Sequence, residues 1–179
     1  MTHDPKLWWL SLLKGSHVNL TVMEKEDLPL YLEWMNSPEV IGDFVPFSLH
    51  SKSELEKKYE ARGPEDGWYF IEEKDGTRIG VVIHFLSGTC FEIGYFVIPS
   101  KRRKGHCTEA IKMIVDYLFH SREIVRIQAC VDVRNLASKK VLQKVGFKQE
   151  GTIRKAGFVW GEWSDRFLYS IIREDWRER

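Results

Sequence analysis

The chain has 179 residues and a formal net charge of +1, with 43% hydrophobic, 30% charged and 13% aromatic residues. This length suits one domain with a single buried core, and the composition is far from that of disordered, collagen-like or membrane proteins. The apolar stretch at 79–86 is too short to span a bilayer. We therefore expect a compact, soluble domain with no membrane partner.

Three cysteines, Cys90, Cys107 and Cys130, leave one thiol without a partner and lack the spacing of a zinc knuckle. This pattern favours a reduced, cytoplasmic protein without a metal site. Residues 1–15 contain a short apolar patch with two tryptophans but no signal-cleavage pattern, so we expect an N-terminal arm followed by one domain over residues 16–179. Aromatic residues of this kind also fit a homodimer contact.

The first hundred residues predict four strands and two helices. The strands are expected over 17–23, 68–72, 78–86 and 90–97, and the helices over 28–35 and 53–62. Acidic residues precede the first helix, and Ser53 with Glu56 resembles a capping box for the second. The Asp75–Gly76 pair predicts a hairpin turn, and Pro99 ends the fourth strand.

The remaining residues predict two helices and further strands. The helices are expected over 108–120 and 135–145, and the strands over 124–133, 146–151, 158–163 and 167–173, with a turn at 160–162. The helix over 108–120 has the clearest apolar face, and Gly146 is a typical helix C-cap. Together these elements predict one layered α/β (α+β) domain with a mixed sheet of about seven strands and four helices.

A basic loop that contains glycine connects the strand over 90–97 to the helix over 108–120. The first turn of a helix presents amides without intrahelical acceptors and about half a positive charge, which stabilises a bound diphosphate. Gly105 allows the backbone to approach such a ligand, and Lys101, Arg102, Arg103 and Lys104 add positive charge. The loop predicts an anion site. A solvated basic loop and a nucleic-acid patch are the alternatives, although the near-zero net charge disfavours nucleic acid.

Charge is unevenly placed along the chain. Acidic residues outnumber basic ones over 1–66, and basic residues outnumber acidic ones over 101–179. An anionic cofactor would be attracted to the second part and a cationic acceptor to the first. This sorting favours two separate binding sites.

Two ordered motifs make the chain resemble the GNAT superfamily of N-acetyltransferases. The stretch from Arg102 to Cys107 is similar to the family's Arg/Gln-x-x-Gly-x-Gly/Ala loop, which binds the pyrophosphate of CoA, although Arg103 and Cys107 replace smaller residues. The stretch from Asn135 to Gly151 is similar to the family's Asn-x-x-Ser helix with the Gly-Phe and Glu-Gly that follow. The ending over 165–176 resembles the branch of ribosomal-protein N-terminal (Rim-type) acetyltransferases.

The resemblance implies a mostly antiparallel sheet whose fourth and fifth strands are parallel and splay apart. It implies an enzyme that moves an acetyl group from acetyl-CoA to a primary amine. The residues it assigns to acetyl-CoA are the strand residues Phe96, Val97 and Ile98, the loop residues Arg102, Arg103, Lys104, Gly105, His106, Cys107 and Thr108, and the helix residue Asn135.

The reaction needs a base for the amine and a proton for the departing thiolate. Glu92 is the candidate base, acting through water, because strand alternation places it on the face opposite its apolar neighbours. His84 is the competing base. The resemblance makes Ser138 the donor beside the thiol, with Tyr95 and Tyr169 as alternatives, and helix capping explains Asn135 equally well.

The acceptor stays open at this level. The overall resemblance favours the N-terminal α-amine of a protein, while polyamines and aminoglycosides are competing acceptors. The loop over 36–50 is expected to influence this choice. A non-catalytic acyl-CoA-binding protein is a further alternative, because Arg103 and Cys107 depart from the family's loop.

Overall fold

The computed structural model describes residues 13–178, so Trp8, Trp9 and most of the expected arm lie outside the described residues. The strands are β1 (Val18–Val22), β2 (Gly67–Glu73), β3 (Arg78–Ser87), β4 (Cys90–Val97), β5 (Arg126–Asp132), β6 (Lys148–Val159) and β7 (Glu162–Ile172). The helices are α2 (Leu28–Met35), α3 (Pro38–Ile41), α4 (Lys52–Glu60), α5 (His106–Ser121), α6 (Leu136–Val145) and α7 (Arg173–Arg177), with short 3-10 turns at Lys25–Asp27 and Pro99–Lys101.

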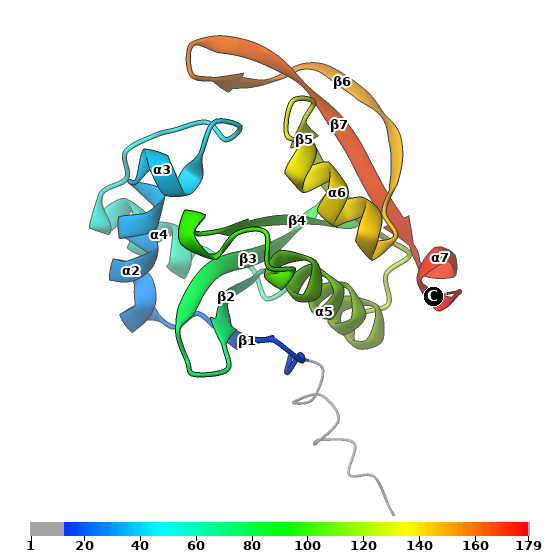
Figure 1. The fold of residues 1–179 in the computed structure, drawn as a ribbon, viewed down its shortest axis with the longest axis horizontal. Helices are drawn as coiled ribbons and strands as arrows, with labels where there is room; N and C mark the ends of the chain where they lie inside the picture. The colour runs from blue at the N-terminus through cyan, green and yellow to red at the C-terminus, as the bar shows by residue number, and fades with distance from the viewer. Residues whose placement is uncertain (1–12, 179) are drawn as a thin grey trace, which may run out of the picture.

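The strands form one seven-stranded sheet in the order β1-β2-β3-β4-β5-β7-β6 (Figure 1). All neighbours are antiparallel except β4 and β5, which are parallel. The connection between these two parallel strands contains α5, as a parallel pair requires a crossover. The predicted fold class, with its mixed and mostly antiparallel sheet, is confirmed.

The two parallel strands are paired only at their beginning. Phe91 lies opposite Ile127 and Glu92 opposite Gln128, and no later residue of β4 has a partner on β5. Beyond Glu92 the strands diverge, and we call this divergence the splay. The structure thus confirms the splayed fourth and fifth strands that the resemblance implied.

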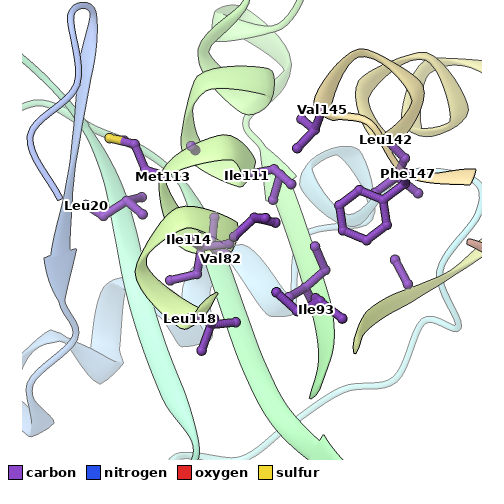
Figure 2. Packing of buried hydrophobic residues seen from close by; sticks show 14 of the residues in the cluster. Leu20, Val82, Ile93, Ile111, Met113, Ile114, Leu118, Leu142, Val145 and Phe147 are labelled. Atoms are coloured by element: carbon purple, nitrogen blue, oxygen red, sulfur yellow. The ribbon is translucent and has the colours of Figure 1, made fainter. Parts of the chain in front are cut away.

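The larger core lies between the sheet and helices α5 and α6. Five residues on one face of α5 are fully buried: Ala110, Ile111, Ile114, Val115 and Leu118. They pack against Val82 and Ile93 of the sheet and, through the same cluster, against Leu142 of α6 (Figure 2). Burying each large side chain contributes roughly 1.5–3 kcal/mol, so this contact fixes α5 and its first turn against β4.

A second core lies on the opposite face of the sheet. Trp34 of α2 and Leu55 of α4 pack there against Phe70 and Val81, and Phe96 of β4 packs at the edge of this cluster. Residues of odd number in β4 therefore face α5 and α6, whereas residues of even number face α2 and α4. This alternation decides on which side of the splay each functional side chain lies.

The structure corrects three details of the expected elements. The described residues contain six α-helices where four were expected, because α3 and α7 have only four and five residues. The capping box of α4 is made by Ser51 and Glu54, two residues before the predicted pair, Ser53 and Glu56. The predicted strand over 158–163 is wrong, because the turn at 160–161 divides that segment between β6 and β7.

Candidate active site

Two backbone amides of β4 point into the splay. The N–H of Ile98 donates to the Ile79 carbonyl of β3 at 2.9 Å, so alternation also directs the N–H of Phe96 toward β3. The N–H groups of Tyr95 and Val97 therefore point away from β3, at positions where β5 has already diverged. Of the three strand residues expected to bind acetyl-CoA, Val97 has the suitable backbone orientation, and Tyr95 joins it.

The first turn of α5 is open to an anion. Its N-cap is Gly105, with φ +86°, which has no side chain to cap the amides that follow. Arg103 also has a positive φ, of 64°, which a non-glycine residue rarely adopts. The amides of the first turn at His106, Cys107 and Thr108 thus lack intrahelical acceptors, and the helix dipole adds positive potential there.

Two of the four basic side chains of the loop are engaged in holding it. Arg102 donates through Nε to the Val97 carbonyl and through Nη2 to the Val40 carbonyl, each at 2.8 Å. Lys101 forms an ion pair with Glu73 of β2. The side chain of Arg102, expected to bind phosphate, instead ties the loop to the end of β4 and to α3. Arg103 and Lys104 remain exposed beside the first turn.

Two other residues of the loop point toward the interior, His106 fully and Cys107 partly buried. His106 is 8% exposed, and its Nδ1 has no hydrogen-bond partner within residues 13–178. Cys107 packs against the main core, and burial raises the pKa of its thiol to about 12. Because the thiol therefore stays protonated near neutral pH, the geometry gives no support to a nucleophilic Cys107.

A hydroxyl pair links β4 to α6 across the splay. The Tyr95 hydroxyl lies 2.8 Å from the Ser138 Oγ. Burial, followed by the nearby Cys107, raises the pKa of Tyr95, so the phenol keeps its proton. Asn135 caps α6, since its Oδ1 accepts from the Ser138 N–H at 3.0 Å. Asn135 thus orients the helix turn that carries Ser138.

The candidate base lies on the opposite face of the sheet from this pair. Glu92 accepts a hydrogen bond from Gln128 Nε2 at 2.9 Å, at the last paired position of β4 and β5. Its carboxylate also lies near Cys130 of β5, where its charge, after burial, raises the pKa of the thiol. The carboxylate is therefore held at the closed end of the splay.

The structure separates the competing groups from this site. His84 lies on the α5 face, where it is 2% exposed and stacks on Tyr69, and Nε2 lies 3.4 Å from the Tyr69 hydroxyl. Burial lowers the pKa of His84 to about 4. Tyr169 is fully buried and donates to Gln149 Oε1 at 3.1 Å. His84, the competing base, and Tyr169, the alternative donor, are therefore both packed in the core.

Long-range contacts join the β6–β7 hairpin to the loop after α3, at the open end of the splay where β4 and β5 have diverged. Trp160, at the tip of the β6–β7 hairpin, stacks on Phe47 with ring centroids 5.5 Å apart, and its Nε1 donates to the Gly42 carbonyl at 3.4 Å. The guanidinium of Arg134 lies 5.9 Å from the Phe44 ring centroid. Figure 1 shows the hairpin arching over the splay toward the segment that follows α3. The sequence indicated the loop over 36–50 but gave no signal that the hairpin meets it.

A mixed sheet whose parallel strands splay beside the N-terminus of a helix is the architecture that the resemblance to the GNAT superfamily implied. The family model "Acetyltransferase (GNAT) domain" matches residues 17–148. This match covers most of the chain, and the chain belongs to the GNAT family of N-acetyltransferases. The acetyltransferase expectation is thereby confirmed.

Known relatives differ in the acceptor that their names give. A probable N-acetyltransferase of Bacillus subtilis, YjcK, is 43% identical over 66% of this chain and 69% of its own. A putative ribosomal N-acetyltransferase of the same organism, YdaF, is 33% identical over 90% of this chain and 94% of its own. The structure of spermidine N-acetyltransferase from Vibrio cholerae with CoA and spermine matches with a TM-score of 0.82 at 20% identity, covering 91% of this chain and 99% of the other.

The structure brings some of the residues singled out in the sequence together. The loop, Glu92 and Ser138 all lie around the splay, and their roles in the reaction stay predictions. The sequence suggested Tyr95 only as an alternative donor to Ser138, not as its hydrogen-bond partner, and it did not single out Arg166 of β7. Arg166 is half-buried, and no local sequence pattern distinguishes a single arginine within a strand.

Proposed function

We propose that this N-acetyltransferase transfers the acetyl group of acetyl-CoA to the N-terminal α-amine of a protein. The observation that carries the proposal is the placement of Glu92 and the Tyr95–Ser138 pair on opposite faces of the splay. A proton acceptor on one side and a proton donor on the other suit transfer between two molecules that meet in the splay. Acetyl-CoA supplies the activated acetyl group when bound.

The residues on the α5 side of the splay fit the phosphate-containing half of acetyl-CoA. The amides of the first turn of α5 and the exposed Arg103 and Lys104 offer hydrogen bonds and positive charge to a diphosphate. The amides of Tyr95 and Val97 offer donors farther along the splay. Gly105 keeps a Cβ away from this surface, since a side chain there would meet nothing of the protein within 4 Å and would project outward.

Glu92 would accept a proton from the amine, directly or through one water. A neutral amine is the reactive form, so the base removes an ammonium proton before transfer. On the other face, the Ser138 hydroxyl would donate toward the departing sulfur while Tyr95, which keeps its own proton, holds Ser138 in place. Starting from the ammonium, the nitrogen loses two protons: Glu92 passes the first to solvent, and the second, lost as the amide forms, replaces the proton that Ser138 gives to the departing sulfur.

The similarity to YdaF over nearly the whole chain favours a protein acceptor. The spermidine acetyltransferase matches the fold at lower identity. A polyamine is the competing acceptor, and a direct comparison separates the two.

The test measures CoA thiol release with purified protein and acetyl-CoA against N-terminal peptides, spermidine and an aminoglycoside. We expect release with peptides and a fall in kcat of about 100-fold for Glu92→Gln, within the range typical of general bases. Binding of acetyl-CoA, followed by calorimetry, should be unchanged in this variant. Glu123→Gln, at an exposed position after α5, is the matched control and should keep native kcat.

Each alternative has its own result. Faster release with spermidine than with every peptide would assign a polyamine acceptor. Acetyl-CoA binding without release on any amine would indicate a non-catalytic protein. Equal kcat for Glu92→Gln and Glu123→Gln would remove Glu92 as the base.

A further inference from the structure

Arg166 lies in the middle of β7, and its guanidinium forms no ion pair with another residue of 13–178. In the register of the sheet it is opposite Asp132 of β5 and Ile153 of β6. Its Nε is buried and has no hydrogen-bond partner in the part of the chain that the structure describes. A buried cationic donor without a partner is costly, so such a group commonly has a ligand.

The nearby acid does not neutralise Arg166. Asp132, whose side chain is fully buried, accepts from Nε and Nη2 of Arg134 at 2.9 Å each and from the Arg134 N–H. This hydrogen bonding lowers the pKa of Asp132 to about 2. The carboxylate across the strand pair from Arg166 is therefore already used by another guanidinium.

The β6–β7 hairpin leaves room for the Arg166 side chain. A Cβ built on Gly157 of β6 would lie 2.8 Å from both Nε and Nη2 of Arg166. Any other residue at position 157 would displace the guanidinium from its present place. The absence of a side chain at this position lets the Arg166 guanidinium lie close to the backbone of β6.

Arg166 lies on the acceptor face of the sheet, the face that carries Glu92. Opposed residues of an antiparallel pair share a face, and Asp132 follows Cys130 and Gln128 at two-residue spacing along β5. Gln128 donates to Glu92, so this row includes the candidate base. Cys130 lies near both Glu92 and Arg166. Burial is the main cause of the raised pKa of its thiol, the charge of Glu92 raises this pKa further, and the charge of Arg166 lowers it.

We propose that Arg166 binds a carboxylate of the acceptor, so that the preferred acceptor is an amine that carries a carboxylate on the same molecule. This inference rests on the proposed function and specifies its acceptor. A guanidinium presents a planar pair of donors that matches a carboxylate, and Glu92 at the other end of the row matches the amine. A polyamine, which carries only positive charge, would face a repulsive Arg166.

The carboxylate has two chemical sources, an acidic side chain near a peptide N-terminus and the α-carboxylate of a free amino acid. The experiment compares kcat/KM for matched pairs of both kinds. One pair is a peptide beginning Ser-Glu and the same peptide beginning Ser-Gln; the other is a free amino acid and its amide. Spermidine is the acceptor without a carboxylate.

We expect the native chain to favour the carboxylate member of one pair by about 10-fold to 100-fold in kcat/KM, mainly through KM, as for a charge-assisted hydrogen bond. Arg166→Gln should abolish that preference and leave acetyl-CoA affinity unchanged, while Arg166→Lys should keep part of it. Arg154→Gln, at an exposed arginine of β6, is the matched control and should keep the whole preference.

Stability separates binding from a structural role. Because the Arg166 Nε has no partner among residues 13–178, the urea midpoint of Arg166→Gln should be equal to or above the native one. A lower midpoint, a native chain without preference in either pair, or a preference that survives Arg166→Gln would each overturn the inference. In all these cases thiol release still demonstrates acetyl transfer, whereas its absence with every amine refutes the proposed function itself.

Discussion

Replacing His84 by glutamine should remove a large part of the pH dependence of stability. The imidazole is 2% exposed among Tyr69, Phe91 and Tyr117, and its Nδ1 has no partner within residues 13–178. Burial, assisted by the charge of Arg122, lowers its pKa from 6.5 to about 4. The unfolded chain therefore takes up a proton on this histidine at a higher pH than the folded protein does.

The sign and size follow from proton linkage. As the pH falls from about 6.5 toward 4, protonation stabilises the unfolded chain alone, so the free energy of unfolding decreases. One pKa unit corresponds to about 1.4 kcal/mol, which limits the total loss to about 3 kcal/mol, with about 2 kcal/mol already lost at pH 5. Above pH 7 the contribution is fully present.

Urea unfolding at pH 7.5 and pH 5 measures this loss in both proteins. The native chain should lose about 2 kcal/mol more than His84→Gln over that interval. Comparing the loss between the two pH values in each protein removes any pH-independent effect of the substitution on the free energy of unfolding. Asp132, whose pKa is lowered to about 2, does not contribute over this interval, because the stability it provides is lost only below about pH 4. Equal losses in the two proteins would refute the assignment of a neutral, buried His84.

Three further predictions concern the site. Tyr95→Phe, which leaves Ser138 Oγ without its partner, should lower kcat in the thiol-release assay about 10-fold with acetyl-CoA affinity unchanged in calorimetry; a native kcat would contradict the pairing. Gly105→Ala should weaken acetyl-CoA binding about 10-fold, whereas the control Gly76→Ala, at nearly the same φ in the β2–β3 turn, should affect only stability. Equal acetyl-CoA affinities of the two variants would show that the loop backbone does not bind the ligand. Trp160→Ala should raise the KM of the acceptor and leave the KM of acetyl-CoA unchanged, because it removes the stacking on Phe47, worth roughly 1 kcal/mol. The control Trp163→Ala, on the same hairpin, should leave the acceptor KM near native.

Local patterns were sufficient for most of the elements. The apolar face of α5 follows the helical period, and alternation marked β1 to β5, so those elements were predicted within two residues of their observed bounds. Capping and turns were less secure, as the shift from Ser53 to Ser51 and the division of 158–163 show. At both places several polar or β-prone residues compete locally, and packing on the sheet selects one of them.

The sequence by itself determined the class of protein, because the loop from Arg102 to Cys107 and the helix from Asn135 carry local backbone requirements that appear as ordered motifs. Only the tertiary structure decided which side chains share a face of the splay. In the structure Arg102 holds the loop, His84 lies on the α5 face and Tyr95 pairs with Ser138. Arg166 lies on the same face as Glu92. The physical reason is that strand register and sheet order join residues far apart in the chain, and neither is encoded in any short segment.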